Sequence, residues 1–324
     1  RVPPGAFACP ASAAFSHAGL GDKNGSRGLS YEDFSMWCNE EAPLLPRVLA
    51  TAMQAIVFGA AGLDAPVGFK GFALPLFDED SRVASAAGLF WLAASEREVE
   101  GALLRRLYAS YADGLSFPRL TELTAGWGGP TLFLVRETPT RRDPTPQEIL
   151  NPKADIETPL EAASFGMYTA TPWKERNGVY GDARSFVFRI APDVRIMRPR
   201  ASRGAGAFAT QYLNTRSHAL PHGLGLGARV SDDNSTATFR MFFPDSLEGC
   251  TAPAADRHFA PGALSVRDAF GLDVLEVWGV ASDARAVAAA LEAQAAAKAD
   301  RDRAIDRARK VDKAAFLGSD FDRG

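Results

Sequence analysis

The sequence predicts an α+β fold, in which an antiparallel β-sandwich lies between a mainly helical N-terminal region and a long C-terminal helix. Short aromatic and β-branched segments, separated by Gly, Pro or Asp, predict the sandwich in the middle of the chain. Apolar stretches of helical length precede it, and an Ala-rich, charged stretch without Gly or Pro follows it. We therefore divide the chain into residues 1–85, 86–281 and 282–324.

Composition limits the classes of function. The 324 residues are 46% hydrophobic, which is enough for a sizeable core, and the net charge of −3 gives no basic field for nucleic acid. No apolar run reaches the roughly 18 residues that a transmembrane helix needs. The three cysteines, Cys9, Cys38 and Cys250, are too far apart for a zinc site or a disulfide framework, so we expect a reducing, cytoplasmic compartment.

The N-terminal region contains a predicted helix at Leu45–Gly62 and, before it, the stretch DKNGSRGLSYED at 22–33. This stretch resembles a calcium loop with degenerate spacing, because Arg27 takes the position of the sharp-turn glycine. The alternative is a turn followed by the start of a strand or a helix. Its candidate calcium ligands are Asp22, Asn24, Ser26, Gly28, Ser30 and Asp33.

Two further helices are expected, at Val83–Ser95 and Phe117–Ala125. The second has Ser116 as its N-cap and Pro118 in its first turn. The predicted strands are Pro130–Thr138, Phe165–Ala170, Arg184–Ala191, Ala237–Phe243 and Leu272–Val280. A Pro-rich stretch at 137–164 is expected to form a long surface loop between two of them.

Residues 222–229, HGLGLGAR, raise the question of a nucleotide-binding loop. A dinucleotide loop follows a buried strand and opens a helix, but Pro221 precedes these glycines and a strand–turn–strand pattern follows them. No Walker loop and no nucleophile elbow occurs in the chain either. The pattern favours strand positions at Gly223, Gly225 and Gly227, where a neighbouring segment packs close.

The C-terminal stretch predicts one helix from Asp283 to about Val311. Its apolar seam is thin, so we expect it to bury little against its own domain and to act as an arm that contacts a partner. The alternative is a solvated helix or a disordered tail. The candidate contact residues are Val287, Leu291, Arg301, Arg303, Ile305, Arg307 and Val311.

Six blocks of the middle region, in order, resemble the TLDc domain of the oxidation-resistance proteins. They are LYASYADGLSFPRL (107–120), GGPTLFLVRET (128–138), FGMYTATPWKERNGVYGDARSFVFRI (165–190), QYLN (211–214), GLGLGA (223–228) and LEVWGV (275–280). The matching positions are Asp113, Gly114, Ser116, Phe117, Gly129, Pro130, Gly166, Trp173, Gly181, Asp182, Phe186, Phe188, Tyr212, Asn214, Gly223, Gly225, Gly227, Glu276, Trp278 and Gly279. The flanks are similar to the lysosomal subgroup of that family, which has an EF-hand-like N-terminal domain and a C-terminal helix.

The resemblance implies two antiparallel sheets and a non-enzymatic regulator. Its partner would be the soluble catalytic sector of the V-ATPase, with the C-terminal helix reaching toward the rotor, on lysosomal or vacuolar membranes. No catalytic residue and no cofactor is implied, apart from calcium at the degenerate loop. Two departures from the family pattern are the long 137–164 stretch and the segment 232–250. Protection from oxidation through cysteine chemistry and a calcium-responsive, membrane-associated adaptor are the alternative functions.

Overall fold

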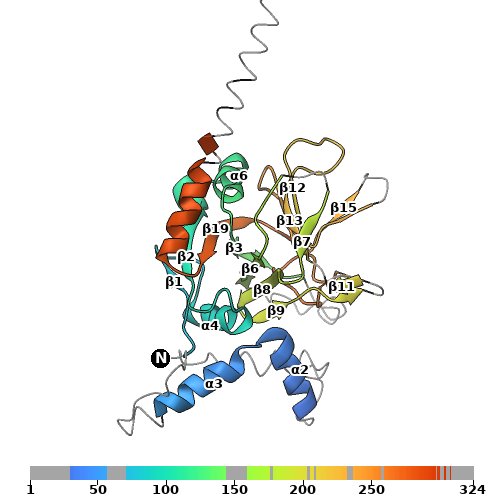
Figure 1. Cartoon of the computed structure of the whole chain (residues 1–324). Helices are drawn as coiled ribbons and strands as arrows, with labels where there is room; N and C mark the ends of the chain where they lie inside the picture. The colour runs from blue at the N-terminus through green and yellow to red at the C-terminus, as the bar shows by residue number, and fades with distance from the viewer. Residues whose placement is uncertain are drawn as a thin grey trace, which may run out of the picture.

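A computed structural model describes residues 30–56, 71–143, 159–175, 178–202, 205–207, 209–231, 236–256, 259–296, 298, 299, 303 and 307. Two multi-stranded sheets, mostly antiparallel, form the centre of the molecule, and helices lie around them (Figure 1). The predicted α+β class with antiparallel sheets is confirmed. Within the described part of the chain, no helix has both the length and the apolar character needed to cross a bilayer.

The larger sheet has seven strands, and the last of them in the sequence lies in its interior. The spatial order is β1 (Leu76–Phe77), β2 (Leu103–Ala109), β19 (Leu272–Ala281), β3 (Thr131–Glu137), β6 (Ser164–Thr169), β8 (Phe186–Ala191) and β9 (Arg195–Met197). Only β1 and β2 pair in parallel. The apolar run of β3 is buried on both faces, because Phe133 and Val135 enter one apolar cluster while Leu132 and Leu134 enter another.

The second sheet has six strands and shares the largest apolar cluster with the first. Its order is β18 (Ala269–Phe270), β17 (Cys250–Thr251), β16 (Met241–Pro244), β13 (Gly223–Leu226), β12 (Ala209–Asn214) and β7 (Tyr180–Asp182). The rings of Phe133 on β3 and Phe243 on β16 are stacked with their centroids 6.3 Å apart. This contact joins the two sheets through their side chains.

Three two-stranded pairs complete the described strands. They are β4 (Thr140–Arg141) with β5 (Leu160–Glu161), β10 (Ala201–Ser202) with β11 (Ala205–Ala207), and β14 (Arg229–Val230) with β15 (Ala237–Thr238). The predicted surface loop at 137–164 therefore begins and ends in the β4–β5 pair, and residues 144–158 lie outside the described part. The strand predicted at Ala237–Phe243 is wrong as a single element. It divides at the buried Arg240, whose guanidinium donates to the carbonyls of Pro253 and Gly262.

The helices are α2 (Tyr31–Glu41), α3 (Leu45–Gln54), α4 (Ala86–Ser95), α5 (Ser110–Asp113), α6 (Phe117–Ala125) and a helix over residues 284–296. α3 begins where the sequence predicted a helix, and the predicted residues after 56 lie outside the described part. α4 begins three residues later than predicted, because the Ser85 hydroxyl accepts the Gly88 N–H as an N-cap.

α2 and α3, the first helices of the described residues, pack directly on the sheet-bearing part of the molecule. Trp37 and Leu45 share a cluster with Phe90 and Trp91 of α4. Polar contacts reinforce this packing, because the guanidinium of Arg198 donates to the carbonyls at the ends of α2 and α4. α2 and α3 are therefore continuous with the core of the molecule and are not a separate module.

Candidate functional site

The candidate site is built on α6, whose start is fixed by its sequence. Ser116 caps the helix by accepting the Arg119 N–H, and Pro118 occupies the first turn, where no backbone donor is needed. Phe117 and Leu120 are buried against the core and hold the helix in place. Phe117 also reaches a pocket beside the helix.

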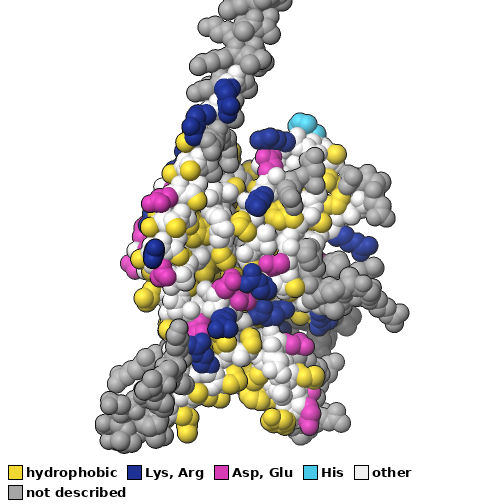
Figure 2. Space-filling model, viewed as in Figure 1, with side chains coloured by type: hydrophobic (Ala, Val, Ile, Leu, Met, Phe, Trp, Pro, Cys, Tyr) yellow, Lys and Arg dark blue, Asp and Glu magenta, His cyan; other side chains and the backbone are white. Residues whose placement is uncertain are grey.

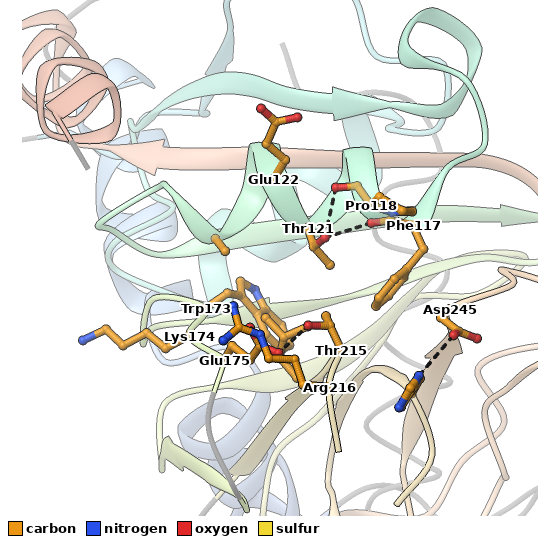
Figure 3. A pocket seen from close by; sticks show the side chains of 13 residues that line it. Phe117, Pro118, Thr121, Glu122, Trp173, Lys174, Glu175, Thr215, Arg216 and Asp245 are labelled. Carbon is orange, nitrogen blue, oxygen red and sulfur yellow. Dashed lines mark hydrogen bonds and ion pairs between the residues drawn. The ribbon is translucent and has the colours of Figure 1, made fainter. Parts of the chain in front are cut away.

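The pocket has a volume of about 720 Å³ and is formed by residues from separate segments of the chain. α6 lies on one side, and Trp173, Glu175, Thr215 and Arg216 lie on the other (Figure 3). Its lining residues are Phe117, Pro118, Thr121, Glu122, Ala125, Trp173, Lys174, Glu175, Leu213, Thr215, Arg216, His222 and Asp245. Trp173 and Leu213 are buried and provide an apolar floor below a charged rim.

The rim carries charges of both signs, and several are paired. Arg216 Nε lies 3.2 Å from Glu175 Oε2, and His222 Nδ1 lies 3.5 Å from Asp245 Oδ2. The two hydroxyls of the lining point elsewhere: Thr121 donates to backbone carbonyls of its own helix, and Thr215 donates to Glu175. Neither hydroxyl meets a histidine, so this lining does not form a nucleophile and base pair. The arrangement suits recognition of a partner with apolar and charged groups.

The C-terminal helix packs beside the same α6. Gln294 Nε2 donates to the Leu123 carbonyl at 2.9 Å, and Lys298 Nζ lies 2.7 Å from Glu122 Oε1. Hydrogen bonds from Lys298 and Arg119 lower the pKa of the Glu122 carboxyl below its usual range. Glu122 thus belongs both to the pocket lining and to the contact with the C-terminal helix.

The C-terminal helix makes a limited contact with its own domain, because no residue of 284–296 is fully buried. Val287, together with Ala286 and Ala290, is partly buried and packs against the main cluster. Small alanine side chains allow this close approach although they give a thin seam in the sequence. Of the other candidate contact residues, Leu291, Arg303 and Arg307 are exposed, and Arg301, Ile305 and Val311 lie outside the described residues.

The glycines of HGLGLGAR lie in and after a central strand of the second sheet. β13 pairs with β12 and β16, and residues 215–222, which include Pro221, separate β12 from these glycines. β14 follows, so no helix opens where a phosphate would bind. A Cβ added at Gly223, Gly225 or Gly227 would lie only 2.4–2.8 Å from a neighbouring atom. That atom is a backbone oxygen or a side-chain atom, and it belongs to β16 or to the residue directly before it.

The remaining family-motif positions are largely structural in their contacts. The Glu276 carboxylate is buried and accepts from Ser81 Oγ, the Arg82 N–H and Trp278 Nε1. The carboxylate of Asp113 accepts the Ala109 N–H, and the Asn214 amide binds the 217–221 loop. Several other motif positions are buried aromatic residues or tightly packed glycines: Gly166, Trp173, Phe186, Phe188, Tyr212, Trp278 and Gly279.

The candidate calcium loop is only partly within the described residues. Asp22, Asn24, Ser26 and Gly28 lie outside them. Ser30 is the N-cap of α2, and its hydroxyl contacts both the N–H and the carboxylate of Asp33. No group of three metal-binding side chains is found among the described residues. In the described part, Ser30 and Asp33 thus form a helix-capping arrangement.

The described cysteines have a low tendency to ionise. Cys250 is buried, and burial raises the pKa of its thiol to about 12. Burial also raises the pKa of Cys38. Because the thiolate is the reactive form, both thiols are poor nucleophiles at neutral pH. This counts against the cysteine-based alternative for these two residues, while Cys9 lies outside the described part.

Sequence reasoning did not single out most residues of the pocket. Among its lining residues, Phe117 and Trp173 are the family-motif positions, and both belong to its apolar part. The charged residues Lys174, Glu175, Arg216 and Asp245 carry no recognisable spacing, since they meet only through the fold. The signal that could have found them is their place beside motif positions: 174 and 175 follow Trp173, and 215 and 216 follow Asn214.

Comparison with known proteins gives one family match and several relatives. The model of the TLDc domain matches residues 86–281. "Restriction of telomere capping protein 5" from Leptosphaeria maculans is 28% identical over 215 residues, which are 56% of this chain and 34% of that protein. "MTOR-associated protein MEAK7" from Danio rerio is 26% identical over 200 residues, 61% of this chain and 37% of that protein. The chain thus spans little more than a third of the length of these relatives.

Proposed function

Because the chain belongs to the TLDc domain family, we propose that it is a non-enzymatic regulator or adaptor that binds the soluble catalytic sector of the V-ATPase. In this proposal, residues 86–281 form the TLDc unit, a sandwich of two sheets. Residues 1–85 form a mainly helical region, and residues 282–324 form the C-terminal helix and tail. The protein would act in the cytoplasm at lysosomal or vacuolar membranes, with its helix directed to the rotor.

The observation that carries the proposal is the double role of α6. One side of this helix lines a pocket with an apolar floor and a charged rim, and the C-terminal helix packs beside it. A partner could therefore contact the TLDc unit and the exposed side of the C-terminal helix together. Two modest contacts on one rigid body give a higher affinity than either contact alone.

Binding of the 324-residue chain to purified V-ATPase soluble sector tests the proposal. We expect co-sedimentation with the unaltered chain, and a reduction of about tenfold in affinity for Leu291→Glu combined with Arg307→Glu, which places negative charge on the exposed side of the helix. Lys174→Glu tests the pocket rim in the same way. Leu160→Glu is the control, because Leu160 is also exposed, at 65% against 36% for Leu291, but lies in the β4–β5 pair.

Absence of any co-sedimentation of the unaltered chain would contradict the proposal. If the control and all the other variants bind the V-ATPase soluble sector equally well, neither the pocket nor the C-terminal helix contributes to that binding. Retained melting temperatures must accompany every comparison, because loss of folding would mimic loss of binding.

A further inference from the structure

α2, α3 and the residues directly after α3 expose an unusual concentration of large apolar side chains. Twelve such side chains are exposed among the described residues, and six of them fall between residues 31 and 56. We call these six the N-terminal face: Tyr31, Phe34, Met36, Leu49, Met53 and Ile56. Figure 2 shows hydrophobic side chains gathered at the lower end of the molecule, over α2 and α3. Exposed patches of this kind mark interaction surfaces more often than isolated apolar residues do.

α3 has two apolar sides. One packs on the core of the molecule, and the other faces solvent. Leu45 and Val48 are buried against α4 and its neighbours. Leu49, Met53 and Ile56 follow one another at spacings of four and three, so they share a different side of the helix. They are 53%, 60% and 65% exposed, respectively. A helix that is already anchored to the core therefore presents a regular apolar stripe outward.

α2 adds aromatic groups and negative charge at the same end of the molecule (Figure 1). Tyr31 and Phe34 are 80% and 41% exposed. Figure 1 shows that the two helices run apart from their junction at residues 42–44, and that both lie at the same end of the molecule. The segment 30–56 contains Glu32, Asp33, Glu40 and Glu41 but a single basic residue, Arg47. Arg47 lies 2.7 Å from Glu100 in an ion pair within the molecule.

This charge decides between two kinds of apolar target. Negatively charged lipid headgroups would be repelled by the carboxylates of α2, whereas Lys and Arg side chains would be attracted. An amphipathic helix with a basic border combines the required apolar stripe with positive charge. The flexible thioethers of Met36 and Met53 adapt to apolar side chains of different shape.

We propose that the N-terminal face is a docking surface for a basic amphipathic helix of a partner protein. The apolar side of that helix would cover Leu49, Met53 and Ile56. Its Lys and Arg side chains would lie beside the carboxylates of α2. This contact is separate from the pocket and the C-terminal helix on which the proposed function rests.

Binding of the full chain to a model peptide tests the proposal. The probe is an 18-residue fluorescent peptide of Leu and Lys arranged as an amphipathic helix, and the controls are a scrambled peptide and a Leu/Glu peptide of the same pattern. We expect saturable binding of the Leu/Lys helix alone, weakened by salt. Leu49→Glu combined with Met53→Glu should lower its affinity about tenfold or more.

Matched substitutions separate the apolar and the ionic contributions. Glu32→Lys should weaken binding several-fold, whereas Glu292→Lys on the C-terminal helix and Leu160→Glu should leave it within about twofold, since both control residues are exposed elsewhere. Binding that is equal for the Leu/Lys and Leu/Glu helices, or unchanged in the Leu49/Met53 variant, would overturn the proposal.

The N-terminal face could instead be covered by another part of the chain, by a second copy or by lipid. Each of these alternatives predicts a different result, and any of those results would overturn the proposal. If the chain itself covers the face, the peptide fails to bind and the Leu49/Met53 variant loses thermal stability. If a second copy covers it, the unaltered chain is a dimer by light scattering and that variant is a monomer. If lipid is the target, vesicles containing phosphatidylserine bind the chain and compete with the peptide.

Discussion

At the scale of the residue, several glycines are required by how closely neighbouring strands approach them. A Cβ on Gly225 would lie 2.8 Å from the Met241 carbonyl oxygen and 2.8 Å from the Phe239 ring. The backbone of Gly225 does not have a positive φ, so the constraint is the contact with β16 and not the torsion angle. Since β13 is paired on both sides, the strand cannot move away to make room.

Gly225→Val is therefore expected to lower the free energy of unfolding by about 2 kcal/mol, with a fall in Tm of about 5 °C. Differential scanning calorimetry gives the Tm. Gly128→Ala is the matched control, because a Cβ at Gly128 meets no atom within 4 Å. An unchanged Tm for Gly225→Val combined with loss of ATP binding would instead support the nucleotide-loop interpretation.

At the scale of the element, the C-terminal helix lies very close to the end of α6. A Cβ on Gly126 would lie 2.6 Å from Gln294 Cγ. Gly126 itself has φ −80° and ψ −17°, a conformation that alanine adopts readily. A substitution at this position thus affects the contact between the helices without straining the end of α6.

Gly126→Ala is expected to displace the Gln294 side chain and break its hydrogen bond to the Leu123 carbonyl. Amide hydrogen exchange in residues 284–296 should become several-fold faster, while exchange in β19 stays unchanged. Gly128→Ala, the same change two residues away, should leave both unaffected. Equal protection of the helix in the two variants would mean that this close contact does not hold it.

The elements that the sequence predicted well have strong local signals. β3 and β19 are apolar and β-branched over nearly their whole length, and α6 has both its N-cap and its proline. β12 was not predicted because it contains the polar residues Gln211 and Asn214, and Asn is depleted in strands. The contact between the C-terminal helix and its own domain was not predicted, because alanines contribute little to an apolar pattern in the sequence. Their small side chains nevertheless allow the helix to lie close to the domain. The pocket could not be predicted, since its charged residues are brought together from distant segments.

At the scale of the whole molecule, α2 and α3 share a core with the TLDc unit. Trp37 is 3% exposed, and its ring centroid lies 6.1 Å from that of Trp91 on α4. Leu44 donates its N–H to the Ala94 carbonyl at 2.9 Å. The family match begins at residue 86, but the packed unit thus extends further toward the N-terminus.

Trp37→Ala should consequently destabilise the whole unit and not only its first helices. Loss of this buried side chain is expected to cost about 3 kcal/mol, and calorimetry should show one transition shifted down by about 8 °C. Leu49→Ala is the control, since Leu49 is 53% exposed and its loss should cost about 0.5 kcal/mol or less. Two separate transitions, with only the smaller one shifted, would show that the helices unfold independently.

The interior place of β19 has a consequence for how a cell makes this protein. β2 and β3 are joined only through β19, which is among the last segments of the TLDc unit to leave the ribosome. Until residues 272–281 emerge, the nascent chain has two unpaired strand edges and an open core, so chaperones have most to protect at that stage. A premature stop codon anywhere before residue 272 would leave a polypeptide that cannot close its larger sheet. Such a product is expected to aggregate or be degraded and not to act as a shortened regulator.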